Sequence, residues 1–178
     1  MTEPTSTDWR RVTSRLDRVE QVAALDLQDP GLRAELDRLA QRTATATGHP
    51  VSMVNVLLTD AQATVGSHGL PALVAGIGGL PGEWSFCVQM VVTGTSLVVP
   101  DLAADPRFRG NPFVQMGLVR SYAGVPLTAA DGTVLGGHCV LSDAAGACSS
   151  ADLSALADGA RQALALLEAH RRPPVTAG

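Results

Sequence analysis

The chain has 178 residues, of which 46% are hydrophobic and 17% are charged, and its net charge is −4. This composition is typical of one folded domain with a single sizeable core, and the acidic balance argues against nucleic-acid binding. The first residues, MTEPTSTDWRR, contain no apolar signal segment, and no apolar run is long enough to span a membrane. We therefore expect a cytoplasmic protein with reduced cysteines and no membrane contact.

Residues 1–28 are predicted to form an N-terminal tail and helix. Residues 1–7 and 172–178 are expected to be disordered. From Asp8 to Ala23, apolar residues recur at alternating steps of three and four, which gives a helix one apolar stripe. The stripe is too short for an independent coiled coil but long enough to pair with another helix, so this segment is a candidate for dimerisation.

Residues 29–171 are predicted to form a single domain that includes the C-terminal helix. Its first helix begins at Asp29-Pro30, with Asp as the cap and Pro at the first helical position, and ends at Gly48. The last helix carries Leu164 and Leu166 away from its main apolar stripe. This additional apolar surface favours a homodimer built from the terminal helices.

The middle of the domain contains strands and short helices. Asp131-Gly132 is a strong signal for a hairpin, and hairpins indicate a largely antiparallel sheet with helices packed against it. The predicted strands are 51–58, 61–67, 96–99, 122–127 and 133–141; short helices are predicted at 83–92 and 111–117, after a Gly- and Pro-rich flap at 69–82, and a capping box at Ser149 begins the last helix.

Several short segments follow one another in a characteristic order. They are 48–51 (GHPV), 83–87 (EWSFC), 93–94 (TG), 97–101 (LVVPD), 105–108 (DPRF), 111–112 (NP), 122–127 (YAGVPL), 131–132 (DG) and 136–140 (GGHCV). Over roughly residues 30–168 this set resembles the GAF domain family, the small-molecule-sensing module of cyclic-nucleotide phosphodiesterases, phytochromes and many bacterial regulators.

The resemblance implies an α+β fold with a central antiparallel sheet of about five or six strands. Terminal helices would cover one face and form dimers, as they do in many members. Short helices and the loops 69–82 and 100–120 would enclose a ligand cavity on the other face. The chain has no lysine, so the Asn-Lys-x-x-Phe-x-x-x-Asp-Glu signature of cyclic-nucleotide binding is absent. No kinase, cyclase, phosphodiesterase or helix-turn-helix sequence adjoins the domain, so we expect a sensor without its own output domain.

Large rings are concentrated near the predicted cavity loops. Four of the six aromatic residues are Trp84, Phe86, Phe108 and Phe113. Such clustering marks a cavity or its lid, although rings that only anchor loops on the core would give the same pattern. The candidate pocket residues are Met53, Asn55, Trp84, Phe86, Cys87, Asp101, Phe108, Phe113, Tyr122 and His138.

The histidines and catalytic motifs give no support for an enzyme. The four histidines lack metal-ligand spacing, and no Ser-His-Asp or phosphate-loop motif is present, so we expect no metal site and no catalysis. One enzyme of the family, the free methionine-R-sulfoxide reductase, uses cysteines in its cavity loops, but the 100–120 loop has none. His138 is interpreted as a hydrogen-bonded residue packed against the helices or cavity wall, with a haem ligand or a pH-sensitive pocket group as alternatives.

Two cysteines are candidates for redox chemistry. Cys87 is interpreted as a buried structural thiol, with a redox-sensing thiol or a bilin attachment site as alternatives; Val88 follows it where bilin-binding relatives place histidine. Cys148 precedes the cap of the last helix, whose N-terminus would lower the pKa of its thiol. It is therefore the candidate for an exposed reactive thiol, against the alternative of a tolerated surface cysteine.

The leading hypothesis is a sensory domain that binds a small, largely apolar or planar molecule between the sheet and the 69–120 loops. Binding would order these loops and shift a homodimer of terminal helices. The alternatives are a protein-interaction module with a vestigial pocket, whose helices dock a partner kinase or regulator, and a thiol or haem redox sensor. The residues do not identify the ligand or a cofactor.

Overall fold

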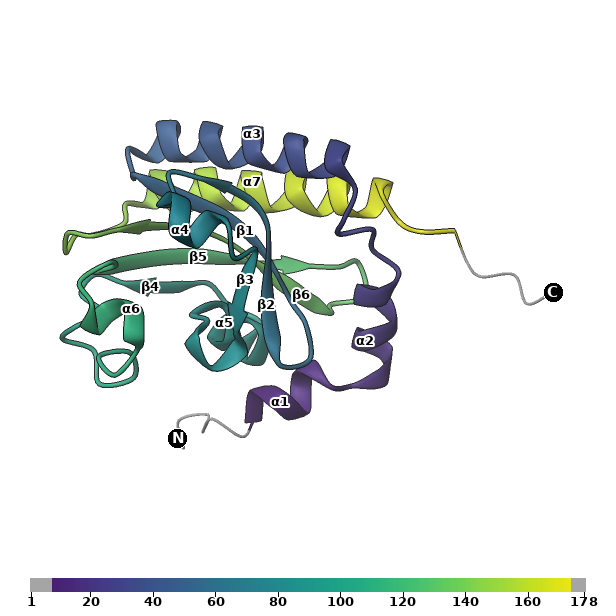
Figure 1. Ribbon diagram of the computed structural model, residues 1–178, viewed down its shortest axis with the longest axis horizontal. Coiled ribbons are helices and arrows are strands. Elements are labelled where there is room, and N and C mark those ends of the chain that lie inside the picture. The colour runs from purple at the N-terminus through teal and green to yellow at the C-terminus, as the bar shows by residue number, and fades with distance from the viewer. Residues whose placement is uncertain (1–7, 174–178) are drawn as a thin grey trace.

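The computed structural model describes residues 8–173 and has the predicted α+β fold (Figure 1). At its centre is a six-stranded sheet in the order β3-β2-β1-β6-β5-β4, in which every neighbouring pair is antiparallel. The strands are β1 (Val51–Leu57), β2 (Ala61–His68), β3 (Gly79–Pro81), β4 (Leu97–Val99), β5 (Ser121–Thr128) and β6 (Val134–Ser142).

Two long helices, α3 (Pro30–Thr47) and α7 (Ser150–Ala169), lie side by side on one face of the sheet (Figure 1). Asp29 caps α3 by accepting a backbone hydrogen bond from its first turn, and Gly48 ends α3 in the left-handed conformation with φ of 69°. Ser149 begins α7 with the predicted capping box. The main core between these helices and the sheet includes Leu32, Leu36, Leu39, Val54, Val56, Leu135, Ala160, Ala163 and Leu167.

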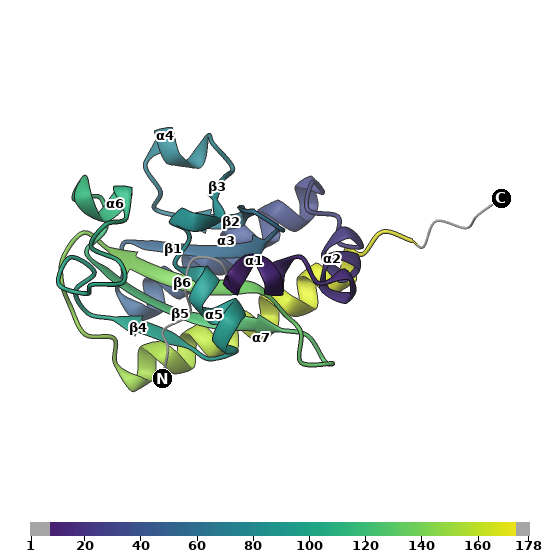
Figure 2. The ribbon, with the colours of Figure 1, turned by 90° about the horizontal axis from the view of Figure 1, so that it is seen from below.

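Shorter elements cover the other face, where Figure 2 shows α1 and α5 on the side of the sheet away from α3 and α7. Met90 of α5 is fully buried against the sheet. A Cβ added at Gly124 or Gly137 would lie 2.9 or 2.3 Å from its Cε atom, so these two glycines allow α5 to pack closely. The shorter helices are α1 (Asp8–Thr13), α2 (Leu16–Ala23), α4 (Ala72–Ala75), η1 (Gly82–Trp84), α5 (Cys87–Thr93) and α6 (Pro112–Gln115).

The prediction of one continuous helix over residues 8–23 is wrong. The segment forms α1 and α2 with a break between them, because Arg18 turns inward instead of facing solvent. Its side chain is 3% exposed and donates hydrogen bonds to carbonyl oxygens at the ends of β1 and β6. The predicted apolar stripe is therefore not the buried face: Trp9 is buried, whereas Leu16 is 72% exposed.

The helices at the two ends of the chain lie on opposite faces of the sheet. Helix α7 packs along α3, and α1 packs against α5 on the opposite face. Leu164 and Leu166, whose apolar surface favoured a dimer, pack at the edge of the main core of their own chain. The backbone N–H of Arg172 donates to the carbonyl of Ala24 at 2.8 Å, so regular contacts extend beyond residue 171. The remaining predicted tails, 1–7 and 174–178, lie outside the described residues.

Two boundaries in the middle of the chain are corrected. The helix predicted at 83–92 begins at Cys87, because the hydroxyl of Ser85 accepts the N–H of Cys87 and leaves η1 as a separate turn. The flap at 69–82 contains α4 and β3, and β3 pairs with β2, so β2 is not an edge strand at residues 61–63. In the described part of the chain, no helix is long and apolar enough to cross a membrane.

Candidate functional site

A small space, which we call the inner chamber, lies between the sheet and the start of α5. Its volume is about 40 Å³, which is room for a molecule about the size of water. Residues that lead into α5 form one side of the chamber, and strands of the sheet form most of the remaining lining. The lining residues are Met53, Asn55, Gln62, Leu80, Trp84, Ser85, Phe86, Cys87, Tyr122 and Leu141.

Neutral polar groups form a connected network on the sheet side of the chamber. The Oδ1 atom of buried Asn55 accepts the hydroxyl of Thr64 at 3.0 Å, and its Nδ2 atom lies 3.6 Å from Sγ of Cys87. The hydroxyl of Tyr122 lies 3.4 Å from the same sulfur. Burial raises the pKa of Tyr122 well above its ordinary value, so the phenol stays protonated. The chamber therefore offers donors and acceptors without a charged side chain in its lining.

A larger open hollow of about 650 Å³, which we call the outer groove, lies between α1, α5 and the loop 107–112. The two hollows share three lining residues, Trp84, Ser85 and Phe86. We call these three residues the wall, since they separate the outer groove from the inner chamber. Movement of the wall would join the two spaces.

Contacts between rings hold the wall against the neighbouring loop. Phe86 packs on Phe108 with ring centroids 5.5 Å apart, and Trp84 packs edge-on against Phe113 at 6.0 Å. The side-chain amide of Asn111 donates to the carbonyl of Trp84 at 2.9 Å. Phe86 also packs on Tyr122 with ring centroids 5.2 Å apart, so the wall is anchored to the sheet as well as to the loop.

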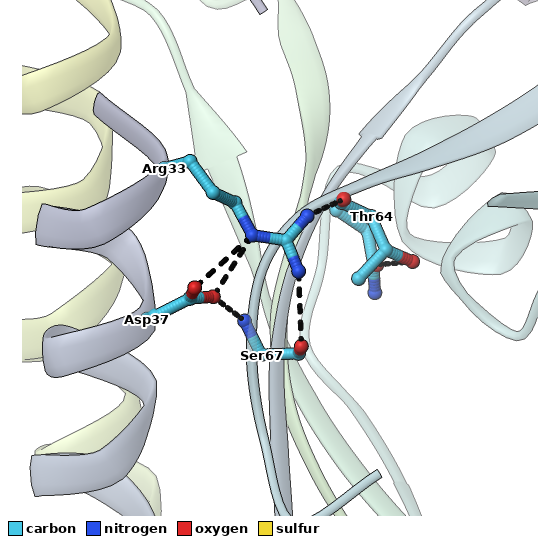
Figure 3. Close-up of polar contacts among 5 residues, drawn as sticks. Arg33, Asp37, Thr64 and Ser67 are labelled. Carbon is cyan, nitrogen blue, oxygen red and sulfur yellow. Dashed lines mark hydrogen bonds and ion pairs between the residues drawn. The ribbon is translucent and has the colours of Figure 1, made fainter. Parts of the chain in front are cut away.

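The flap lies over the β2 side of the chamber, where a polar cluster completes the sheet edge (Figure 3). Arg33 of α3 pairs with Asp37 and donates to the carbonyl of Thr64 at 2.9 Å and to the hydroxyl of Ser67 at 3.3 Å. Asp37 accepts the backbone N–H of Ser67 at 2.7 Å. These side chains satisfy backbone groups of β2 beyond the end of β3, where an unpaired edge would remain. A void of about 20 Å³ between this cluster and the flap shares Met53 with the inner chamber.

His138 does not line the chamber, so its assignment to the ligand pocket is corrected. The side chain is fully buried on the helix face of β6, where its Nδ1–H donates to the carbonyl of Met53 at 3.0 Å. Its Nε2 atom therefore accepts the hydroxyl of Thr43, at 2.9 Å. Both nitrogens have partners, which leaves no lone pair for haem iron. A Cβ added at Gly159 would lie 2.6 Å from Nε2, so this glycine gives the ring its space under α7.

Asp101 and Cys148 also lie away from the chamber. Asp101 pairs with Arg120, whose hydrogen bond holds the pKa of the carboxyl at about 2, and it caps the loop by accepting the N–H of Ala103. Cys148 packs beside Leu156 on the helix face. Burial and the neighbouring carboxylate of the capping box raise the pKa of the Cys148 thiol. The expected lowering by the helix N-terminus is therefore wrong.

The other sequence candidates are brought together around the chamber, as its lining or as supports of the wall. Sequence reasoning missed four participants: Gln62, Thr64, Ser85 and Cys139. Gln62 and Thr64 alternate on one side of β2, a polar pattern that indicates a face away from the main core. Cys139 and His138 are neighbours in β6 and therefore lie on opposite faces of the sheet, which places Cys139 beside the chamber. Ser85, which donates to Gln62, has no comparable signal in the sequence.

No group of three or more possible metal ligands from histidine, cysteine, aspartate and glutamate occurs among residues 8–173. The arrangement instead places a few neutral polar side chains among apolar and aromatic ones around a small space.

The chain is similar to a known family and to several known proteins. The family model described as "GAF domain" matches residues 31–167. A cyclic di-GMP phosphodiesterase of Pseudomonas aeruginosa is 36% identical over 102 residues, which cover 55% of this chain. They cover 16% of that relative, so the chain spans a small part of its length.

Two solved structures illustrate the match in fold. The GAF domain of a phosphoenolpyruvate-protein phosphotransferase from Acinetobacter aligns with a TM-score of 0.65 at 18% identity, covering 86% of this chain and 92% of that one. A free methionine-R-sulfoxide reductase from Neisseria meningitidis, solved with its substrate, aligns with a TM-score of 0.62 at 23% identity, covering 96% of each chain. At these identities the likeness shows the fold alone.

Proposed function

Because this chain belongs to the GAF domain family, whose members are generally sensory or regulatory modules, we propose that it senses a small molecule at the wall. The observation that carries the proposal is the shared wall itself. Trp84, Ser85 and Phe86 separate the small inner chamber from the larger outer groove. A ligand that enters from the outer groove displaces the wall and extends into the chamber.

The chemistry of the chamber supports the expected ligand. Its lining is mainly apolar and aromatic, and the amide of Asn55 and the hydroxyl of Tyr122 already have partners. A largely apolar or planar molecule that packs on Trp84 and Phe86 fits this lining.

The output of the proposed sensor is a homodimer through α3 and α7. Support comes from their side-by-side position on the face opposite the chamber, with a shallow hollow between Arg38, Arg42 and Gln162 on their outer side. Light scattering coupled to gel filtration tests this part. A monomer at all accessible concentrations would contradict it and favour docking of a partner kinase or regulator instead.

The proposal assigns sensing and not catalysis to the domain. Its chamber lining lacks an acid–base pair, and the loop 100–120 has no cysteine. Incubation of the protein with methionine-R-sulfoxide and dithiothreitol is expected to yield no methionine above the rate without protein. Turnover would overturn this assignment.

Native mass spectrometry and absorption spectroscopy of the protein as purified test the ligand site. We expect a bound small molecule whose adduct is lost in Leu80→Phe, because the larger ring fills the chamber under β3. The matched variant Leu118→Phe, at a residue that is 51% exposed, should keep the adduct. Melting temperatures identify any variant that fails to fold.

Two results would contradict the ligand site. An adduct equally present in both variants would place the ligand elsewhere. Absence of any adduct, together with no thermal shift after incubation with fractionated cell metabolites, would favour an interaction module with a vestigial pocket.

A further inference from the structure

Two cysteines from different elements meet at the inner chamber. Cys87 begins α5, Cys139 lies on β6, and both are buried. The Nδ2 atom of Asn55 lies 3.6 Å from Sγ of Cys87 and 3.7 Å from Sγ of Cys139. The amide of Asn55 thus contacts the sulfurs of two cysteines that lie 52 positions apart in the sequence. Cys148 lies on the other face of the sheet.

The packing of α5 on β6 brings these sulfurs together. A Cβ added at Gly137 would lie 3.4 Å from Sγ of Cys87, so the glycine lets the thiol rest directly on the sheet. A disulfide requires Cβ atoms about 3.5–4.5 Å apart. Cys87 is the first residue of α5, and the chain is extended at Ser85 two residues before it, so a small shift toward Cys139 does not require the rest of α5 to unwind.

We propose that Cys87 and Cys139 form a redox-active pair that hydrogen peroxide converts into a disulfide. Cys87 borders the chamber of about 40 Å³. A space of this size admits a molecule comparable to water, which occupies roughly 30 Å³ in the liquid. Hydrogen peroxide meets this limit, whereas a bulky oxidant such as glutathione disulfide does not.

The reaction proceeds in two steps that balance. The thiolate of Cys87 attacks one peroxide oxygen, the O–O bond breaks, and the other oxygen leaves as water after taking up the proton that Cys87 released. The resulting sulfenic acid of Cys87 is attacked by the sulfur of Cys139, which forms the S–S bond. The hydroxyl leaves as water with the thiol proton of Cys139. Two thiols thereby lose two electrons, and one hydrogen peroxide is reduced to two water molecules.

The surroundings of the two thiols assign their roles. The neighbouring Cys139, together with Tyr122 and Asn55, lowers the pKa of the Cys87 thiol despite its burial. The neighbouring Cys87, together with burial, raises the pKa of Cys139. Since the thiolate is the nucleophile, Cys87 reacts with peroxide and Cys139 resolves the sulfenic acid.

The test measures thiols in the folded, full-length protein. Reduced protein is treated with hydrogen peroxide, quenched in acid, denatured, alkylated and digested for peptide mass spectrometry. We expect a loss of two hydrogens per chain and one peptide pair linked by Cys87 and Cys139, with Cys148 alkylated. Glutathione disulfide at the same concentration should give at least ten-fold less of the linked pair.

Single variants distinguish this pair from adventitious oxidation. Cys148→Ser, the matched control, should form the disulfide at the wild-type rate. Cys139→Ser should form none and leave a sulfenic acid on Cys87 that dimedone traps, while Cys87→Ser should leave Cys139 unmodified. Circular dichroism establishes that each variant is folded.

Three outcomes would overturn the proposal: all three thiols alkylated after peroxide in folded protein, a disulfide that includes Cys148, or oxidation only in urea. The experiment uses no sensory ligand. It can therefore fail while the proposed ligand site holds, and the ligand site can fail while the thiol pair reacts.

Discussion

The two faces of the sheet are built for different purposes. On the helix face, α3 and α7 cover the strands, and side chains such as Leu36, Leu135 and Leu156 have no exposed surface. On the loop face, the same sheet presents Asn55 and Tyr122 to short helices and loops, which leave the inner chamber and the outer groove. A second buried cluster, which includes Phe86, Met90 and Leu102, packs on this face, so the faces differ in these hollows and not in the presence of a core.

This difference shows how the domain can combine a stable fold with an adaptable site. Conformational openings begin where few apolar contacts and local hydrogen bonds hold a segment. Trp84, which is 37% exposed, is the part of the wall that comes nearest to this description, whereas the sheet under α3 and α7 does not meet it. A ligand or a disulfide on the loop face can therefore act on the wall while the helix face keeps its structure.

The largest effect is expected from His138 on the helix face. Desolvation lowers its pKa from 6.5 to about 4 in the folded chain. Between these values the unfolded chain binds a proton that the folded chain does not, so stability is complete above pH 6.5 and falls as the pH approaches 4. The expected loss is about 1.4 kcal/mol per pH unit within this window, or about 3 kcal/mol in total.

Urea denaturation at several pH values measures this loss. His138→Gln removes the titrating group, so its unfolding free energy should decline less steeply between pH 6.5 and 4 than that of the wild type. The comparison uses the slope of unfolding free energy against pH. A destabilisation of the variant that is the same at every pH does not change this slope. Equal slopes would mean that the ring is not held neutral under the helices.

A smaller effect on the same face is expected from Gly66 in β2. A Cβ at this position would lie 2.4 Å from Cβ of Leu36 and 2.8 Å from its carbonyl carbon. Because Leu36 belongs to α3 and is fully buried, the helix must move away from the sheet in Gly66→Ala. We expect a loss of about 2 kcal/mol in unfolding free energy.

Gly110 provides the matched control on the loop face. No atom lies within 4 Å of a Cβ added there, so Gly110→Ala should change the free energy of unfolding by about 0.5 kcal/mol or less. Similar losses in the two variants would contradict the difference in packing density between the faces.

Most of the helix face follows from local sequence signals. Asp29, Gly48 and the capping box at Ser149 mark the ends of α3 and α7, because each satisfies backbone groups within a few residues. The Asp131-Gly132 turn likewise identifies the hairpin of β5 and β6, with Gly132 at φ of 89°. Such interactions are local, so the residue pattern contains them.

The errors arise where distant residues decide the structure. Arg18 occupies a buried position because carbonyls at the ends of β1 and β6 accept its hydrogen bonds, and no local pattern reveals those partners. The chamber likewise depends on contacts between residues that are distant in the sequence. The meeting of Cys87 with Cys139 depends on how closely α5 approaches the sheet, which Gly124 and Gly137 allow only in the folded chain. Alternation along β6 predicted the face of Cys139 but not its partner.

The smallest effect, and the most direct probe of the wall, is expected from Phe113 on the loop face. Its ring packs edge-on against Trp84 with centroids 6.0 Å apart, a contact worth about 1 kcal/mol. Phe113→Ala should therefore lower the global free energy of unfolding by about 1 kcal/mol, but hydrogen exchange at residues 82–93 should increase while β1 and β6 remain protected. Leu118→Ala, at an exposed residue near the end of the same loop, should change neither quantity. A uniform loss of protection across the sheet would show that the wall and the main core open together, and the independence of the two faces would then be lost.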